Sequence, residues 1–288
     1  MSEITIAITQ MSCTGDTKEN TAKAEDLVRQ AADEGADLVL LPELFETPYF
    51  CIDQDPKHFG RAHIADNNPL IPRFQKLAAE LNVVLPVSYF ERAGNARFNS
   101  VNMIDADGSI AGRYRKSHIP QNPGYEEKYY FSPGDTGFQA LQTRIGRVGC
   151  GICWDQWFPE TARAMALKGA EILLFPTAIG SEPSDPETDS AAHWRRVMQG
   201  HAGANFMPLA ASNRVGTETS DDRSITFYGT SFIADHTGAI IVDMDRTEEG
   251  VATASFDLDA IRSYRDDWGV FRDRRPDLYG AIGSLDAS

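Results

Sequence analysis

Short apolar runs alternate with amphipathic stretches along this 288-residue chain, and this alternation limits the folds that it can adopt. Residues 3–10 and 37–41 have the composition of buried strands, whereas residues 17–36 between them show the apolar spacing of a helix that stops at Gly35. A strand, a helix and a second strand in this order form one unit of an α/β sheet. Because the alternation continues along the chain, we predict a layered α/β domain in which helices cover buried sheets.

The same patterns predict most of the remaining elements. We expect further helices over residues 68–82, 159–170 and 191–205, and strands over residues 83–90, 100–105, 110–116, 147–153, 171–177, 207–213, 228–245 (a hairpin) and 251–259. The least regular segments are 44–68, 117–137 and 178–190, and long loops on a compact domain are often functional. No linker divides the chain, so we expect a single domain over residues 1–288. Residues 259–288 are a candidate C-terminal arm, which either reaches a neighbouring subunit or stays solvated.

The net charge of the chain limits the classes of ligand that it is expected to bind. With 42 acidic and 27 basic residues, the formal net charge is −15, which argues against nucleic acid and anionic membranes and favours cationic small molecules. No apolar run approaches the roughly 18 residues that a membrane span requires, and the N-terminus lacks the pattern of a signal peptide. We therefore expect a cytoplasmic protein.

The four cysteines do not form the pattern of a disulfide framework, which fits a reducing compartment. Cys150 and Cys153 have the spacing of a redox pair, but such a pair usually begins a helix, whereas these two residues lie in or at the end of a predicted strand. We therefore interpret Cys150 as a core residue. Cys13 and Cys51 are isolated and no histidines are paired, so the sequence does not predict a metal site, and we expect no cofactor.

Three reactive residues each follow a predicted strand: Glu43, Lys116 and Cys153. In α/β proteins, ligands bind at such strand ends. Each residue alone is more often an ordinary loop or core residue. Together they suggest one reaction, because a thiol nucleophile needs a base for its proton and a positive group for the oxyanion that follows.

The segments around these residues, "LLPELF", "GRYRKSHIP" and "GICWDQWFPE", resemble the three catalytic motifs of the nitrilase superfamily of carbon–nitrogen hydrolases. Further segments, including "PGYEEKYYFSPGDTGF", "PTAIGSEP" and "HWRRVMQGHAGAN", resemble its N-carbamoylputrescine amidase branch. The resemblance covers nearly the whole chain. It implies a four-layer α-β-β-α sandwich, a homo-oligomer, and an enzyme that cleaves N-carbamoylputrescine to putrescine, carbon dioxide and ammonia in the synthesis of polyamines from agmatine.

Two alternatives stay open at this point. The same machinery could act on another carbamoyl amine, a carbamoyl amino acid or an aliphatic amide. From a different class, a non-catalytic binding protein on this fold is expected to have lost one of the three reactive residues, and none is lost here.

The resemblance also implies roles for individual residues. Cys153 matches the nucleophile, Glu43 the general base and Lys116 the group that stabilises the oxyanion. Glu127 matches a second glutamate of the family, with Glu126 as the alternative one position earlier.

A second set of residues is expected near the substrate. Glu182 matches the acidic contact for the distal ammonium of a small cationic carbamoyl amine, and Trp154 and Tyr49 are candidates for the walls around its aliphatic chain. His118 is expected to be a structural hydrogen-bonding residue. The neighbouring acids Asp185, Glu187 and Asp189 are expected to lie on an exposed loop.

Overall fold

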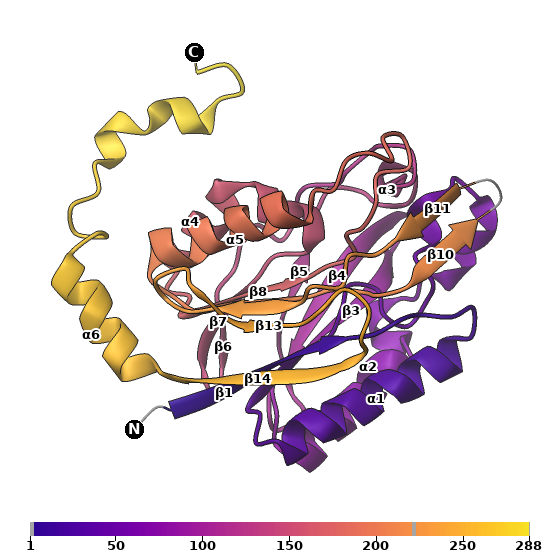
Figure 1. Ribbon diagram of the computed structural model, residues 1–288, viewed down its shortest axis with the longest axis horizontal. Coiled ribbons are helices and arrows are strands. Elements are labelled where there is room, and N and C mark those ends of the chain that lie inside the picture. The colour runs from indigo at the N-terminus through magenta and orange to yellow at the C-terminus, as the bar shows by residue number, and fades with distance from the viewer. Residues whose placement is uncertain (1–2, 221–222, 288) are drawn as a thin grey trace.

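Two six-stranded sheets face each other at the centre of the molecule (Figure 1) in a computed structural model that describes residues 3–220 and 223–287. The first sheet has two halves, which a parallel bridge between Leu38 and Val84 joins. In spatial order its strands are β14 (Gly250–Asp257), β1 (Glu3–Gln10), β2 (Leu38–Leu40), β3 (Leu85–Ala93), β4 (Ala96–Ile104) and β5 (Ile110–Arg115). The second sheet consists of β13 (Ile240–Asp243), β12 (Phe232–Ala234), β9 (Leu209–Ser212), β8 (Ile172–Pro176), β7 (Gly146–Cys150) and β6 (Leu141–Thr143).

Helices cover the outer face of each sheet. The helices α1 (Thr17–Asp33) and α2 (Leu70–Leu81) pack on the first sheet, and α4 (Pro159–Leu167) and α5 (Ala191–Asn205) pack on the second. The layers therefore run helices, sheet, sheet, helices. This is the four-layer sandwich that the sequence led us to expect.

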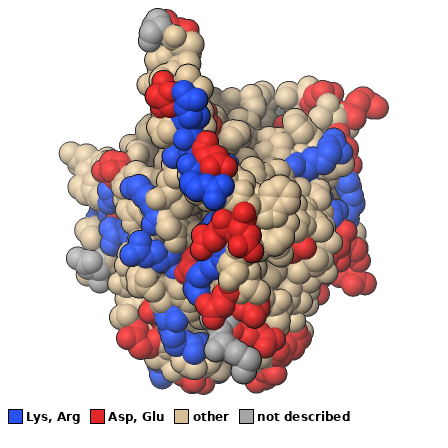
Figure 2. Space-filling view, turned by 90° about the vertical axis from the view of Figure 1, so that its left-hand side faces the viewer, with Lys and Arg blue, Asp and Glu red and all other residues tan. Residues whose placement is uncertain are grey.

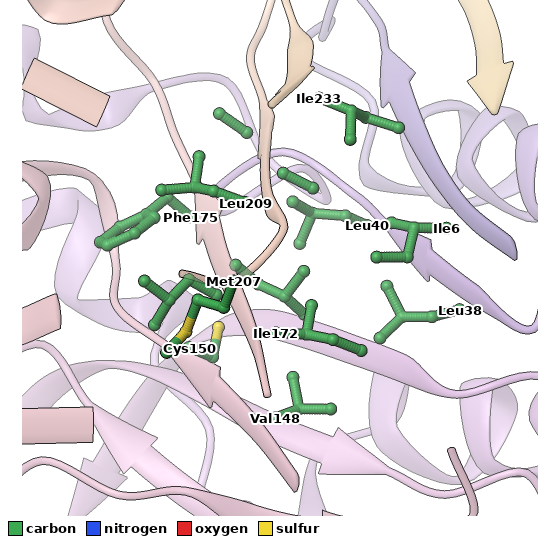
Figure 3. Packing of buried hydrophobic residues seen from close by; sticks show 14 of the residues in the cluster. Ile6, Leu38, Leu40, Val148, Cys150, Ile172, Phe175, Met207, Leu209 and Ile233 are labelled. Carbon is green, nitrogen blue, oxygen red and sulfur yellow. The ribbon is translucent and has the colours of Figure 1, made fainter. Parts of the chain in front are cut away.

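Alternation of side chains along the central strands explains why the two sheets bury both faces. In β1, Ile6 and Ile8 point into the core between the sheets, whereas Ala7 packs with the helices of the outer layer. Figure 3 shows Ile6, Leu38 and Leu40 of the first sheet opposite Ile172 of the second. Apolar residues on both faces are what a sheet covered on two sides requires.

The element boundaries differ from the expected ones in several places. The strand expected over residues 147–153 ends at Cys150, and a short 3₁₀ helix, Cys153–Trp157, follows it. The hairpin of β3 and β4 extends further toward its turn than expected, because the pairing continues to Ala93 and Ala96. Other elements that were not expected are β6, the short helix α3 (Glu127–Tyr130), and the two strands of a hairpin, β10 (Thr217–Ser220) and β11 (Arg223–Thr226).

The C-terminal segment contains a helix that the sequence analysis did not predict. The last strand ends at Asp257, whose side chain accepts hydrogen bonds from the amide groups of Asp259 and Ala260 and so caps α6 (Leu258–Trp268). Beyond α6 the chain runs away from the sheets (Figure 1), and Figure 2 shows basic and acidic side chains along this projection. The single domain over residues 1–288 stays a prediction, and residues 1, 2 and 288 lie outside the described part. Among the described residues, no helix is both long and apolar enough to cross a membrane.

Candidate active site

Glu43, Lys116 and Cys153 come from both sheets and meet between them. Glu43 lies in the loop after β2, and Lys116 directly follows β5, where its amide group still donates to the carbonyl of Asn99 on β4 at 2.8 Å. Cys153 begins the 3₁₀ helix after β7 of the second sheet. The structure thus brings together three residues that are widely separated in the sequence.

Lys116 lies between two carboxylates, and all three side chains are fully buried. Its Nζ is 2.8 Å from Oε1 of Glu43 and 2.6 Å from Oε2 of Glu127. Asn99 Nδ2 donates to the same Oε1 of Glu43 at 2.6 Å, and the Tyr49 hydroxyl donates to Oε1 of Glu127 at 2.7 Å. Such contacts offset the cost of burying the charges.

The electrostatics of these groups depend on their mutual distances. Burial alone would lower the pKa of Lys116, but the carboxylates of Glu127 and Glu43 outweigh burial and raise this pKa well above its ordinary value. Burial raises the pKa of Glu127 to about 7; Lys116 opposes this rise and Glu43 adds to it. Lys116 therefore keeps its proton, while Glu127 titrates near neutrality.

Cys153 is held as a protonated thiol in a strained turn. Burial raises the pKa of the thiol well above its ordinary value, and the carboxylate of Glu43 raises it further, although Lys116 opposes them. The backbone of Cys153 has a φ of 42°, in the left-handed region that non-glycine residues rarely adopt. Since the thiol holds its proton, attack by the sulfur requires a base beside it.

Glu43 has an oxygen available for that task. Lys116 and Asn99 both bind its Oε1, whereas Oε2 is buried and has no hydrogen-bond partner within residues 3–220 and 223–287. A buried carboxylate oxygen without a donor is uncommon and needs an explanation. A proton transferred from the thiol would satisfy it.

A buried acid, Asp155, fixes the turn that carries Cys153. Asp155 Oδ2 accepts from the amide group of Ile152 at 3.0 Å and from the Tyr114 hydroxyl at 2.8 Å. Its Oδ1 accepts from the amide group of His118 at 2.9 Å and lies 2.7 Å from the Nδ1 of that residue. The ring of His118 also stacks on Phe158 at a centroid distance of 3.6 Å. His118 therefore contacts the turn from behind and is not among the residues that line the cavity.

A cavity of about 220 Å³ opens in front of Cys153. Its lining contains two of the expected substrate contacts, Trp154 and Glu182, and also Glu127. The full lining is Pro120, Asn122, Tyr125, Glu127, Cys153, Trp154, Gln156, Trp157, Ala178, Ile179, Glu182 and Thr188. No lysine or arginine is in this set, and of its two carboxylates Glu127 is already paired with Lys116. Glu182 is therefore the group that suits the cavity to a cationic ligand.

The carboxylate of Glu182 is the outer acid of the cavity. It is half-buried, and its burial raises its pKa, as does the nearby Asp185. Neither a hydrogen-bond donor nor a cation of the described residues pairs with its side chain, which leaves the carboxylate open to a ligand. Asp185, Glu187 and Asp189 follow on the exposed loop, as expected.

Tyr49 does not have the position that we expected. The residue is buried, it does not line the cavity, and its ring packs edge-on against Tyr125 and Phe227. Its hydroxyl instead binds Glu127. The expectation of a substrate wall is therefore corrected: Tyr49 supports a carboxylate of the site from the side away from the ligand.

Two assignments that the sequence left open can now be located. Glu127 contacts Lys116, whereas Glu126 points to Gln54 and to Arg223 at 2.9 Å. Cys150 is a free, buried thiol in the core between the sheets. Cys150 does end β7, but Cys153 begins a short 3₁₀ helix, which corrects our expectation that it ends a strand. Both thiols are free, and only Cys153 lines the cavity.

Asn99 and Asp155 were missed by the sequence reasoning. Asp155 lies inside the "GICWDQWFPE" segment, so its place beside the nucleophile was a usable signal. Asn99 had no such signal, because its role follows from the pairing of β4 with β5. In the part of the chain that the structure describes, no group of three or more histidine, cysteine or acidic residues has the arrangement of a metal site.

Comparison with known proteins shows the family of the chain. The model of the carbon–nitrogen hydrolase family matches residues 5–266. An N-carbamoylputrescine amidase of Arabidopsis thaliana is 57% identical over 99% of this chain and 97% of that protein. A citrullinase of Francisella tularensis is 55% identical over 98% of this chain and 99% of that protein. The crystal structure of a carbon–nitrogen hydrolase from Helicobacter pylori superposes with a TM-score of 0.91 at 38% identity, covering 99% of both chains.

Proposed function

Because the chain belongs to the carbon–nitrogen hydrolase family, we propose that it hydrolyses N-carbamoylputrescine to putrescine, carbon dioxide and ammonia. The observation that carries this proposal is the cavity that joins the Cys153 thiol to the unpaired Glu182 carboxylate without a basic side chain. A ureido group at the thiol and an ammonium at Glu182 match the two ends of this substrate. The amidase from Arabidopsis thaliana supports the same substrate.

The first half of the reaction forms a covalent intermediate. Oε2 of Glu43 takes the thiol proton as the sulfur of Cys153 attacks the ureido carbon. A ureido carbonyl is a poor electrophile, because two nitrogens donate electrons to it, so the developing oxyanion needs strong stabilisation. Lys116 and the amide group of Trp154, which lies in the first turn of its helix, supply it. Glu43 then passes the proton to the departing ammonia, and a carbamoyl thioester remains on Cys153.

The second half releases the products. Water attacks the thioester carbon and gives a proton to Glu43, which returns it to the sulfur of Cys153 as the carbon–sulfur bond breaks. The released carbamate decomposes to carbon dioxide and putrescine. In both halves Glu127 holds Lys116 charged and in place, which is consistent with its contact at 2.6 Å.

The citrullinase relative favours one alternative, hydrolysis of citrulline. Citrulline has the same ureido group and also carries an ammonium, but it adds a carboxylate. Among the residues that line the cavity, no lysine or arginine is available to bind that carboxylate. The amine therefore fits the cavity better than the amino acid.

A panel assay tests the proposal. Ammonia release is measured with N-carbamoylputrescine, citrulline, other carbamoyl amino acids, aliphatic amides and nitriles, for the native protein and for Cys153→Ala and Cys150→Ser. We expect the highest kcat/KM with N-carbamoylputrescine, no turnover by Cys153→Ala, and most of the activity in Cys150→Ser. Faster turnover of citrulline would reassign the substrate, and full activity of Cys153→Ala would exclude the thioester.

We also propose a cellular setting for this reaction. A thiol nucleophile functions only while reduced, and the four free cysteines support a cytoplasmic location. Putrescine as the product supports a place in polyamine synthesis. Exposed apolar side chains near the C-terminus, Trp268, Leu278 and Ile282, support a homo-oligomer, which analytical ultracentrifugation of the full chain and of a chain ending at residue 273 tests. If the shortened chain forms the same oligomer as the full chain, the role of this segment is contradicted.

A further inference from the structure

We propose that one buried ion pair, Arg214 with Glu218, positions both of the carboxylates that flank Lys116. Arg214 Nη1 is 2.8 Å from Oε1 of Glu218, and the arginine is fully buried. Neither residue lines the cavity. They are therefore positioning residues, and the inference rests on the proposed catalytic roles of Glu43 and Glu127.

The proposal has two branches, one for each carboxylate. The first branch consists of the hydrogen bonds by which Arg214 holds the main chain at Glu43. Arg214 donates to the carbonyl of Glu43 from Nε at 3.3 Å and from Nη2 at 2.9 Å, and to the carbonyls of Leu44 at 2.7 Å and Thr47 at 3.0 Å. With the bond to Glu218, all five N–H groups of the guanidinium are used. A lysine at this position has three donors on a flexible stem and cannot reproduce this arrangement.

The backbone at this point needs such support. Leu44, the residue after the general base, has a φ of 51°, which is unfavourable for a side chain that is not glycine. Strained residues persist where surrounding contacts over-determine the backbone. Arg214 binds the carbonyl of Leu44, and Ser88 Oγ accepts from its amide group at 3.0 Å. Loss of the arginine would let this turn relax and move Glu43.

The second branch runs to Glu127. Oε2 of Glu218 accepts from the amide group of Tyr49, whose hydroxyl donates to Oε1 of Glu127 at 2.7 Å. The guanidinium carbon of Arg214 lies 5.9 Å from the centre of the Tyr49 ring and 5.7 Å from that of Phe227. One ion pair on the segment after β9 thus fixes the main chain of Glu43 and the tyrosine that orients Glu127.

Arg214→Lys tests the first branch, and the chain offers a matched control. Arg265 on α6 donates to the carbonyl of Phe206, a residue that also has a left-handed backbone, with a φ of 52°. Unlike Arg214, it has no contact with the residues around Lys116, and it does not line the cavity. We expect Arg214→Lys to lower kcat roughly ten- to a hundredfold, since small displacements of catalytic groups have effects of this size. Arg265→Lys should keep kcat within about twofold at similar loss of stability.

Binding measurements separate positioning from substrate recognition. Calorimetry in the Cys153→Ala background should give N-carbamoylputrescine the same Kd, within about twofold, with Arg214 or with lysine at that position, because the arginine does not contact the cavity. Urea midpoints show that each protein is folded under the assay conditions. Equal losses of kcat in Arg214→Lys and Arg265→Lys, or no loss in either, overturn the inference.

Glu218→Gln tests the second branch and also serves if Arg214→Lys does not fold. This change keeps the guanidinium of Arg214 and its hydrogen bonds to three carbonyls. It removes the negative charge of residue 218, which binds both Arg214 and the amide group of Tyr49. We expect a loss in kcat of about tenfold and a shift of the acid limb of the pH profile, which a smaller folded fraction alone does not produce. An unchanged pH profile with unchanged kcat overturns this branch.

The test also distinguishes this inference from the proposed substrate. If the native protein releases no ammonia from N-carbamoylputrescine, the proposed function fails, and the rate of alkylation of Cys153 by iodoacetamide replaces turnover. Because Glu43 assists loss of the thiol proton, Arg214→Lys should slow this alkylation several-fold relative to Arg265→Lys. Equal alkylation rates overturn the inference without any reference to substrate.

Discussion

At the residue scale, we expect the choice of a cationic substrate to depend on Glu182, which lines the cavity. The ammonium of N-carbamoylputrescine lies about four methylenes from its ureido group and needs an anionic partner to offset its desolvation. A hydrogen bond to a charged group contributes roughly 1.5–3 kcal/mol, so Glu182→Gln should lower kcat/KM about ten- to a hundredfold. A neutral carbamoyl alkylamine of the same length is the control, and its kcat/KM should change much less. Equal losses for both substrates would mean that Glu182 shapes the loop and does not bind the amine.

The hydroxyl of Tyr49 should set the acid limb of the rate profile. It donates to the ionised form of Glu127, a carboxyl whose pKa burial raises to about 7. As the pH falls through this pKa, Glu127 takes a proton and loses its hold on Lys116. In Tyr49→Phe the ionised form loses a donor, so the acid limb of kcat should move to higher pH by roughly one unit. Tyr89→Phe removes a buried hydroxyl that binds Asn102 and should leave the profile unchanged.

At the scale of elements, Gly134 is where a loop packs against the strand end that carries Lys116. Its amide group donates to the carbonyl of Lys116 at 2.8 Å, and a Cβ at this position would lie only 2.1 Å from the carbonyl oxygen of Arg115. Gly134→Ala must therefore displace backbone, and we expect it to lower the free energy of unfolding by about 1–3 kcal/mol and to reduce kcat. Gly60→Ala is the control, because nothing lies within 4 Å of its added Cβ. Urea unfolding and ammonia release of both variants decide it, and equal behaviour would contradict the packing argument.

Sequence patterns predicted most of the long elements, α6 excepted, and missed several of the short ones. Seventeen residues of α1 show a clear apolar periodicity, whereas the three residues of β6 are too few to show any. The hairpin of β10 and β11 escaped prediction for the same reason, although it carries Glu218. The end of β7 was misjudged because "GIC" has the apolar character of a strand, while the bonds of Asp155 turn the chain there.

Some residues of the candidate site could be predicted from the sequence, and others could not. Glu43, Lys116, Cys153 and Glu127 could be proposed from local motifs, and the structure brings them together around Lys116 and the cavity. The position of Tyr49 could not be predicted from a local motif. It depends on Glu218, 169 residues away, and on Glu127, 78 residues away. Contacts at such separations leave no local trace in a single sequence.

At the scale of the whole molecule, the net charge of −15 should affect the capture of substrate. Acidic and basic side chains are mixed on the face in Figure 2, and a net charge of this size acts on a charged ligand as a long-range field. At an ionic strength near 0.01 M the Debye length is about 30 Å, and at 1 M it is about 3 Å. We expect kcat/KM for N-carbamoylputrescine to fall several-fold over this range, while that for a neutral carbamoyl alkylamine stays constant. A parallel fall for both would point to a salt effect on the protein itself.

The acidity of the cavity also acts on what leaves it. Hydrolysis turns a substrate with one positive charge into a diamine with two, while the carboxylate of Glu182 stays on the wall and no lysine or arginine is among the lining residues. The feature that admits the substrate thus retains the product more strongly. We therefore expect release of putrescine, and not cleavage of the ureido bond, to limit turnover, and we expect added putrescine to slow the enzyme.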